Sequence, residues 1–494
     1  MGIGDISYAR NWSAPPLEVQ GTDPKRPEPI VRPNKGVVLA AGSGTRLSRY
    51  SRTPKMLQPL LGVPLVERAV HTLLRAGLDT VIVVYGAHPE VGEYCRRVFG
   101  GTDGELGRVK VVYAPRWQEG NGASLTAVAP FIKPGERFVS ISGDHYTPVR
   151  CIEALLEGRA PSILVDSSVP EGVDVEEATK VLCDAEGRVI RVGKQLEGVD
   201  CFRLYLDAGA HLLTSQVFAY LDSMATGVQS EVTVSSALEA MAQDVPLYVV
   251  EVPKGSTWQD IDTPQDLAWA RRKALKELRG TKDGIIARYI NRPLSLAITA
   301  GIARFRPSPN AISTFALFLA LVASLTASLS EISPLLVAIL IQLVSVIDGV
   351  DGEIARATFS ESRFGRLLDG VFDRIGDTAI LTGVALRSLA YGTRVQYVIL
   401  LLGISVASSL LSMSSKDRLE LVAPLEVRSY IERSERLIGN LLAGRDGRLL
   451  ILAVFMALGK PTLALGIVGL VATTGLVIRL SAAYKLVRLG SNFG

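Results

Sequence analysis

The chain has 494 residues and a formal net charge of +4, so it is too long for one core and two or three domains are expected. The near-neutral charge, without a basic tract with interleaved aromatic residues, argues against nucleic acid as a partner. Its 4 cysteines lack paired spacing, which argues against a disulfide framework or a zinc site and favours a reducing cytoplasm.

Hydropathy divides the sequence into a punctuated first half and an apolar second half. Residues 1–34 are proline-rich and lack the apolar stretch of about 7–15 residues found in signal peptides, so a flexible leader is expected. Residues 35–275 have short apolar stretches, and residues 276–309 read as a linker with a juxtamembrane amphipathic helix. Residues 310–494 predict an all-α membrane domain of about six transmembrane helices. The long apolar runs are Phe315–Thr326, Leu335–Ile347, Val395–Leu411, Leu449–Leu458 and Leu463–Leu480.

The first predicted strand leads into a glycine-rich loop. Residues 36–40 are apolar, and the sequence Ala-Gly-Ser-Gly-Thr-Arg-Leu follows at 41–47. Such a loop can hold phosphates on its backbone N–H groups. A dinucleotide fingerprint needs a third small residue where Leu47 stands, and a P-loop needs Gly-Lys followed by Ser or Thr. The loop therefore indicates another kind of nucleotide site.

Leu39 to Arg46, followed by Pro54 and Lys55, resembles the opening motif of the sugar-nucleotide pyrophosphorylases. Four later segments, in the same order as in that family, extend the resemblance over roughly residues 35–275 and imply an α/β, Rossmann-like nucleotidyltransferase fold. They are the base-recognition loop Glu119–Ser124, the strand end Ser142–His145, the sugar-phosphate segment Val192–Lys194 and the late motif Trp258–Pro264.

The resemblance also implies roles for individual residues. Arg46 and Lys55 would neutralise phosphate charge, Asp144 and Asp260 would hold magnesium, and Lys194 would contact the polyol phosphate. An acceptor phosphate would attack the α-phosphorus of a nucleoside triphosphate, with pyrophosphate leaving and no covalent intermediate. The implied nucleotide-binding residues are Leu39, Ala40, Ala41, Gly42, Gly44, Thr45, Lys55, Gly120, Asn121, Ser124 and Asp144.

Several of these residues also have simpler interpretations. Lys194 could be a solvated lysine, and residues 120–122 could form an ordinary loop. Asp262 could cap the helix expected to begin near Pro264, because Asp before a proline at the first helical position is a common start signal; Asp260 is therefore preferred as the metal ligand. The histidines lack zinc spacing and are expected to be structural; they are His71, His88, His145 and His211.

Four carboxylates interrupt the apolar half at helical spacing. Asp348 and Asp351 are three residues apart, and Asp369 and Asp373 are four apart, so each pair projects from one helix face. A carboxylate inside a membrane costs roughly 2.5–3.5 kcal/mol and needs a partner, a metal or a water-filled cavity. Two such pairs predict an oxygen-only site for hard divalent cations.

The complete pattern, including Gly352, Ala355, Arg356 and Gly365, resembles the signature of the CDP-alcohol phosphotransferases. The resemblance implies two divalent metals, Mg²⁺ or alternatively Mn²⁺, about 3.5–4 Å apart. Asp348, Asp351 and Asp369 would be ligands, and Asp373 both a ligand and the base that deprotonates the attacking hydroxyl. Arg356 would neutralise the diphosphate, while Gly352 and Ala355 would let the nucleotide approach the helix.

The distribution of Lys and Arg predicts a cytoplasmic active-site mouth in a cell-membrane protein, with the first domain also in the cytoplasm. Arg387, Arg394 and Lys460 are exceptions to this rule.

The two halves together resemble a family of bifunctional enzymes. These enzymes couple CTP to inositol 1-phosphate and join the CDP-inositol to a second inositol 1-phosphate, giving phosphorylated di-myo-inositol phosphate for compatible-solute synthesis. The arginines expected to hold the acceptor phosphate are Arg433, Arg436, Arg445 and Arg448; they could instead be a positive cluster beside anionic lipid headgroups. The alternatives are a lipid alcohol as acceptor, or a degenerate binding module fused to one membrane enzyme. A homodimer in the bilayer is expected.

Overall fold

The computed structural model describes residues 32–48, 50–100, 106–169, 173–196, 202–225, 231–279, 285–422 and 444–490. The expected leader therefore lies almost entirely outside the described residues. The chain divides into two compact units, Met1–Ala274 and Leu275–Gly494, and each is described by itself.

The first unit is built on a nine-stranded mixed sheet with the main order β10-β9-β11-β6-β1-β4-β5, and with β8 pairing both β11 and β12. At its centre β1 runs parallel to both β4 and β6, whereas β11 runs antiparallel to β6. The strands are β1 Lys35–Ala40, β4 Thr80–Tyr85, β5 Val109–Tyr113, β6 Arg137–Ser142, β8 Ser162–Asp166, β9 Lys180–Cys183, β10 Val189–Gly193, β11 Arg203–Thr214 and β12 Tyr248–Glu251.

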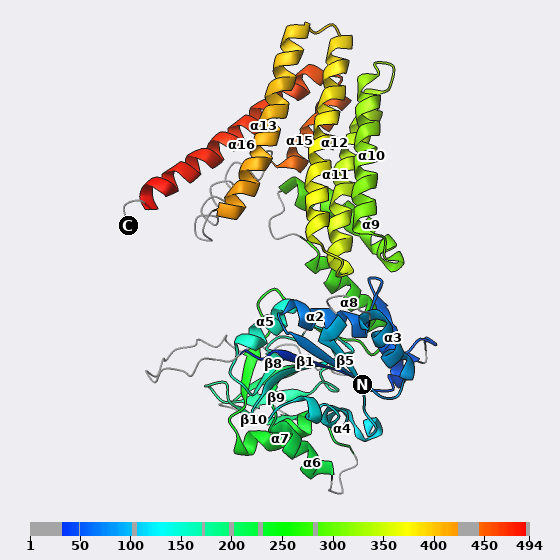
Figure 1. Cartoon of the computed structure of the whole chain (residues 1–494), viewed down its shortest axis with the longest axis vertical. Helices are drawn as coiled ribbons and strands as arrows, with labels where there is room; N and C mark the ends of the chain where they lie inside the picture. The colour runs from blue at the N-terminus through cyan, green and yellow to red at the C-terminus, as the bar shows by residue number, and fades with distance from the viewer. Residues whose placement is uncertain are drawn as a thin grey trace, which may run out of the picture. The chain divides into compact units, whose positions relative to one another are not determined.

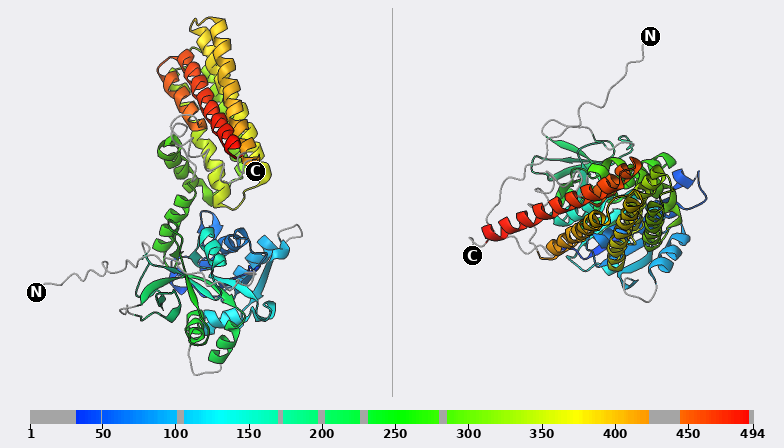
Figure 2. Two further views of the ribbon diagram at one scale, coloured as in Figure 1. Left: turned by 90° about the vertical axis from the view of Figure 1, so that its left-hand side faces the viewer. Right: turned by 90° about the horizontal axis from the view of Figure 1, so that it is seen from above.

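Helices cover both faces of this sheet (Figures 1 and 2). Alternate residues of β1 enter two cores: Val37 packs with α4, α6 and α7, and Val38 packs with α2, α3 and α5. Strands buried on both faces need nearly continuous apolar sequence, as Thr80–Tyr85 has. The helices are α2 Leu65–Arg75, α3 Pro89–Phe99, α4 Asn121–Thr126, α5 Val149–Glu157, α6 Val217–Ala225 and α7 Val234–Asp244.

The carboxyl ends of β1 and β6 lie side by side, which is where open α/β sheets bind ligands. The loops that follow these strands meet there, since Gly143 N donates to Leu39 O at 2.9 Å. A second small sheet brings the late motif to the same edge. It pairs β7 (His145–Tyr146) with β13 (Gln259–Asp260), and Asp260 lies opposite His145.

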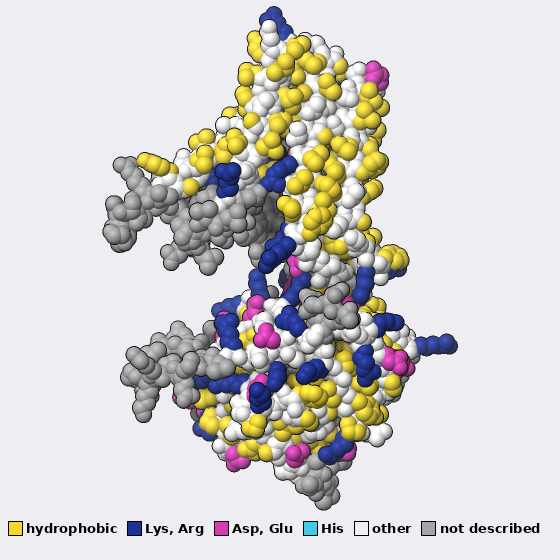
Figure 3. Space-filling model, in the orientation of Figure 1, with side chains coloured by type: hydrophobic (Ala, Val, Ile, Leu, Met, Phe, Trp, Pro, Cys, Tyr) yellow, Lys and Arg dark blue, Asp and Glu magenta, His cyan; other side chains and the backbone are white. Residues whose placement is uncertain are grey.

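The second unit is helical. Its helices are α9 Arg292–Ile302, α10 Pro309–Ser328, α11 Pro334–Ala357, α12 Arg363–Ala390, α13 Val395–Val422, α15 Arg445–Ala457 and α16 Pro461–Gly490. Apolar side chains cover much of the surface of this unit visible in Figure 3. Within the described residues, 4 helices are long and apolar enough to cross a membrane: α10, α11, α13 and α16. A count of about six spans stays a prediction, because α12 carries several charges and α15 has only 13 residues.

One of the cations that broke the charge rule has a structural explanation. Arg387 of α12 is fully buried, and its guanidinium donates to Ala327 O at 2.9 Å and to Thr326 O and Ile332 O, both at 3.1 Å. These carbonyls belong to the end of α10 and the turn after it. A cation suits a helix C-terminus, where backbone carbonyls lack intrahelical partners.

Arg387→Met is expected to destabilise the helical unit by about 1.5–3 kcal/mol, the range for hydrogen bonds to charged groups. A lower thermal midpoint in detergent measures this. Arg394→Met is the matched control, because Arg394 is an exposed cation from the same expected side. An equal loss in both variants would contradict the capping role.

Candidate active sites

The glycine-rich loop is shaped by close packing against Lys55. Gly44 has φ +58°, and a Cβ there would lie 2.6 Å from Lys55 Cβ, so both its conformation and its surroundings require glycine. His88 supports the loop through a 3.0 Å contact between Nε2 and Ser43 O. Gly42, Thr45 and Arg46 are exposed, whereas the predicted contacts Leu39, Ala40 and Ala41 are buried at the strand end.

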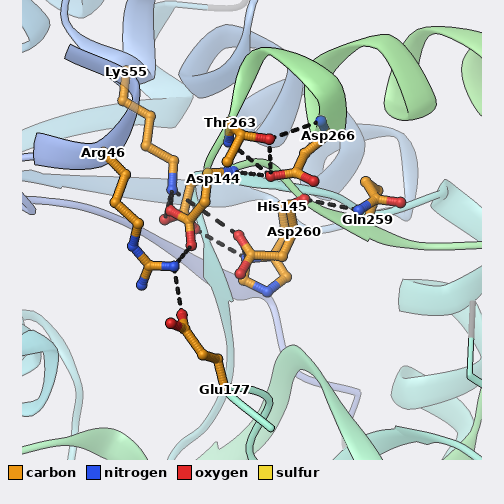
Figure 4. Close-up of polar contacts among 10 residues, drawn as sticks. Arg46, Lys55, Asp144, His145, Glu177, Gln259, Asp260, Thr263 and Asp266 are labelled. Carbon is orange, nitrogen blue, oxygen red and sulfur yellow. Dashed lines mark hydrogen bonds and ion pairs between the residues drawn. The ribbon is translucent and has the colours of Figure 1, made fainter. Parts of the chain in front are cut away.

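Lys55 lies among three carboxylates (Figure 4). Its Nζ is 2.8 Å from Asp144 Oδ2, 2.6 Å from Asp262 Oδ1 and 4.0 Å from Asp260 Oδ1. Burial alone would lower the pKa of Lys55, but the carboxylates, Asp144 foremost, raise it well above its usual value. Burial would raise the pKa of Asp144, yet Lys55 and His145 together hold it far below its usual range. Lys55 and Asp144 therefore stay charged and neutralise each other.

The expectation that Asp262 caps the following helix is wrong. The cap of α8 (Pro264–Glu277) is Thr263, whose Oγ1 accepts from Asp266 N at 3.2 Å, while Asp266 Oδ2 accepts from Thr263 N at 2.7 Å. The Asp262 carboxylate instead bridges Lys55 and Arg46, with Arg46 Nη1 at 2.9 Å. Sequence reasoning missed it, because the side chain that takes the capping position is the threonine one residue later.

A group able to hold a metal ion forms beside Lys55. Asp144, His145 and Asp260 each offer a ligand atom, all within 4.8 Å of one another. The structure therefore places the two predicted metal ligands, Asp144 and Asp260, together. Their carboxylate oxygens suit Mg²⁺. His145 was expected to be structural, but it lies in the site: burial would lower its pKa, and Asp260 and Asp144 raise it to about 9. The one available signal was its position directly after Asp144.

The side chains of two predicted base-recognition residues form hydrogen bonds within the protein. Asn121 Oδ1 accepts from Val234 N at 2.9 Å, and the Ser124 hydroxyl donates to Gly120 O at 3.1 Å. A Cβ at Gly120 would lie 2.3 Å from Val232 O, so the glycine allows two backbones to approach. Residues 121–122 begin α4 and are not part of an ordinary loop, so the base-recognition role stays a prediction. Lys194 is exposed after β10.

In the helical unit, Asp348 of α11 and Asp369 and Asp373 of α12 each offer a ligand oxygen within 4.8 Å of the others. The fourth predicted carboxylate, Asp351, adjoins this group, because it shares a side-chain hydrogen bond with Asp369. Asp351 also accepts hydrogen bonds from the Ser313 hydroxyl and from Gly352 N. An all-oxygen group fits a hard divalent cation.

Arg445 of α15 reaches into this cluster. Its Nη1 is 2.6 Å from Asp348 Oδ2 and 3.1 Å from Asp373 Oδ1, and its Nε is 3.0 Å from Asp377 Oδ1. Arg448 Nη2 lies 3.9 Å from Asp377 Oδ2. Two of the four predicted phosphate-binding arginines, Arg445 and Arg448, are therefore paired with carboxylates. The other two, Arg433 and Arg436, lie outside the described residues. Asp377 was missed, although it continues the four-residue spacing after Asp373.

The small residues of the signature lie beside Arg356. A Cβ at Gly352 would be 3.3 Å from Arg356 Nη1, Ala355 is half-buried, and Arg356 Nη2 also donates to Leu278 O at 3.1 Å. Glu353, between these positions, is a second residue that sequence reasoning missed.

Glu353 has a fully buried carboxylate. It pairs with Arg292 Nη1 at 3.0 Å and accepts from Ser295 Oγ at 2.6 Å and Thr299 Oγ1 at 2.7 Å. All three partners belong to α9, so Glu353 anchors that helix to the signature turn of α11.

A small cavity adjoins the acid cluster of the helical unit. Its lining combines the acids and Arg445 with apolar side chains of the surrounding helices. The apolar residues that α10 contributes are Ala316, Leu317 and Ala320.

Comparison with known proteins places both units in enzyme families. Residues 36–171 match the MobA-like NTP transferase domain family, and residues 307–433 match the CDP-alcohol phosphatidyltransferase family. The inositol-1-phosphate CTP transferase from T. maritima is a structural neighbour with a TM-score of 0.41 and 21% identity, covering 49% of this chain and 96% of that one.

Two relatives match across both units. The bifunctional IPC transferase and DIPP synthase of Rubrobacter xylanophilus is 32% identical over 455 residues, which cover 90% of this chain and 95% of that protein. The protein of the same description from Thermococcus kodakarensis is 30% identical over 364 residues, covering 73% and 76%. The predicted order of an α/β nucleotidyltransferase followed by a helical membrane domain is confirmed. This chain belongs to the family of bifunctional IPC transferases and DIPP synthases.

Proposed function

We propose that the chain makes CDP-inositol from CTP and inositol 1-phosphate and then transfers the inositol phosphate to a second inositol 1-phosphate. The first step releases pyrophosphate and the second releases CMP, giving phosphorylated di-myo-inositol phosphate for compatible-solute synthesis. The observation that carries the proposal is the pair of carboxylate clusters, one in each unit, on a chain similar over 90% of its length to a bifunctional relative.

In the first site, Arg46 and Lys55 bind the triphosphate and orient its α-phosphorus toward the inositol phosphate. Lys55 exchanges a carboxylate for a phosphate oxygen when the nucleotide enters, and stays charged in both states. Asp144 and Asp260 would hold Mg²⁺, or Mn²⁺ as the alternative, and the ion would supply positive charge for the departing pyrophosphate. Lys194 contacts the polyol phosphate from the exposed end of β10.

In the second site, Asp373 accepts the proton of the attacking hydroxyl. Asp348, Asp351 and Asp369 would hold the divalent metals together with Asp373, and Arg356 binds the diphosphate of the donor beside Gly352. Arg445 pairs with Asp348 and with the proposed base Asp373, and Arg448 lies beside Asp377. From there the two arginines can hold the acceptor phosphate by charge-assisted hydrogen bonds. No covalent enzyme intermediate is required.

The test is phosphorus NMR of the products formed by purified full-length protein with CTP, Mg²⁺ and inositol 1-phosphate. Resonances of CDP-inositol, followed by those of a phosphodiester carrying a phosphomonoester, are expected. A reaction that stops at CDP-inositol would reject the second step as written.

A lipid alcohol acceptor is the alternative, and the apolar α10 wall of the cavity favours it. Transfer from premade CDP-inositol to either inositol 1-phosphate or added lipid alcohols separates the two. A soluble acceptor predicts that Arg448→Met raises the KM for inositol 1-phosphate more than the KM for CDP-inositol. Turnover with lipid alone would promote the alternative.

Residues 1–280 expressed alone are expected to be soluble and to release pyrophosphate from CTP with inositol 1-phosphate. The first compact unit ends at Ala274 and has its own two-sided core, which supports independent folding. Pyrophosphate release by the purified fragment measures this, and the same fragment with Asp144→Ala is the inactive control. A folded but inactive fragment would show that this site depends on the rest of the chain.

The remaining expectations concern assembly and orientation. The chain is a membrane protein by its four apolar helices and its family. We propose the cell membrane as its location, the cytoplasm for the first unit, and a homodimer. Light scattering of the detergent-solubilised protein tests the dimer, and protease access to the first unit in sealed vesicles of known orientation tests the side.

A further inference from the structure

His145 lies in a slot that three different parts of the first unit build. Its ring stacks on Trp258, with centroids 5.9 Å apart and planes 14° from parallel. Trp258 is itself held by a 3.0 Å hydrogen bond from Nε1 to Asp166 Oδ2. The edge of the ring that carries Nε2 lies against Gly209 of β11, where an added Cβ would be 2.8 Å from His145 Cδ2 and Nε2.

The Gly209 wall of the slot is formed by an irregularity in β11. Gly209 has φ +74°, and its N donates to Asp207 Oδ1 at 2.8 Å. Asp207 Oδ2 is in turn 3.0 Å from His211 Nε2. The register of β11 against β8 shifts between Asp207 and His211, as at a β-bulge, and bulges often re-aim groups beside active sites.

The slot determines which ring nitrogen faces the site. Nε2 lies at the Gly209 wall, and Nδ1 is 3.0 Å from Asp144 Oδ1 and 4.0 Å from Asp260 Oδ1. A carboxylate oxygen only accepts hydrogen bonds, so Nδ1 carries the proton and donates to Asp144. A protonated nitrogen has no lone pair for a metal, and Mg²⁺ prefers oxygen ligands.

We propose that His145 is a positioning residue of the cytidylyltransferase site. It donates from Nδ1 to Asp144 and fixes the carboxylate in the orientation that binds the divalent cation. The inference rests on the proposed function of this site. Hydrogen-bonding partners of metal ligands typically affect metal affinity or activity by about 10–100-fold.

Two substitutions separate a positioning role from direct ligation. The amide nitrogen of Asn stands the same number of bonds from Cα as Nδ1, whereas that of Gln stands where Nε2 does. His145→Asn is expected to retain the wild-type Mg²⁺ requirement. His145→Gln is expected to raise the half-saturating Mg²⁺ for pyrophosphate release by about 10–100-fold, with kcat recovered at high Mg²⁺. The full-length protein in detergent is used, with His71→Gln as the control outside the site.

A second readout does not depend on turnover. Mn²⁺ binding is measured by electron paramagnetic resonance on an Asp348→Asn, Asp373→Asn background, which disables the other acid cluster. The Gln variant is expected to bind Mn²⁺ more weakly and the Asn variant as the parent does. Equal loss in both would indicate direct ligation and overturn the proposal, and unchanged binding in both would overturn it too.

If the Gln variant does not fold, His145→Ala provides the test, because it leaves the slot beside Trp258 empty. Added imidazole is expected to restore the low Mg²⁺ requirement, and failure to do so would contradict the positioning role. Wild-type protein that releases no pyrophosphate would instead reject the proposed function, so the two failures are distinguishable.

Discussion

Asp373→Asn is expected to lower kcat for transfer from premade CDP-inositol by about 10²–10⁴-fold, the range for loss of a general base. The amide cannot accept the proton of the attacking hydroxyl, and it also removes one of the carboxylates that surround Arg445. CMP release measures the effect. Formation of CDP-inositol in the other unit should continue at the wild-type rate, because Asp373 has no part in that site.

Asp348→Asn and Asp369→Asn should resemble Asp373→Asn, since all three carboxylates belong to one group. Glu331→Gln is the matched control, because it removes an exposed carboxylate that lies before α11 and accepts a hydrogen bond from Ser330. CMP release near the wild-type rate in the Asp373 variant would exclude this residue as the base.

Lys55→Met is expected to lower kcat for pyrophosphate release by about 10²–10³-fold, as when one preorganised donor to a developing anion is removed. Lys55 is 4% exposed and pairs with Asp144 and Asp262. Its loss removes the cation that these carboxylates share and leaves Arg46 beside Asp262 and His145 beside Asp144. The variant should therefore also be less thermally stable when no metal is added. Mg²⁺ should restore more stability to the variant than to the wild type.

Lys35→Met is the control for this experiment. Lys35 is the first residue of β1, at the end of the strand opposite the site, and it pairs with Glu136 at 2.8 Å. Its loss should leave pyrophosphate release intact. Equal activity of the Lys35 and Lys55 variants would mean that the central lysine serves the fold and not the chemistry.

The resemblance to a known family was enough to predict the first site in outline. The fold explains why its residues meet, because the loops with Gly44 and Asp144 follow β1 and β6, which are parallel neighbours in the mixed sheet. Gly44, Lys55, Asp144 and Asp260 meet as expected at the ends of β1 and β6. The role of Asp262 could not be predicted, since it depends on the pairing of β7 with β13, a contact of two residues per strand. A capping residue does stand before Pro264, as the rule for helix N-termini predicts, but it is Thr263 and not Asp262.

Helical spacing likewise predicted the second cluster, but only along each helix. Asp348, Asp369 and Asp373 converge because α11 and α12 both pack against α10. The contact of Arg445 with these acids depends on where α15 packs, and no periodicity in the sequence specifies that. Packing between helices also explains Arg387. The rule that places Lys and Arg on the cytoplasmic side treats it as an exception, but its partners are backbone carbonyls of another helix.

The Glu353 anchor bears on where this polypeptide can be divided into two working enzymes. The apolar runs suggest a cut near residue 310, and the family match to the second half begins at residue 307. A cut there removes α9, and with it the ion pair and hydrogen bonds of the Glu353 carboxylate, two residues from Asp351. A stand-alone transferase should therefore begin before residue 285, so that it keeps the segment that links the two catalytic units.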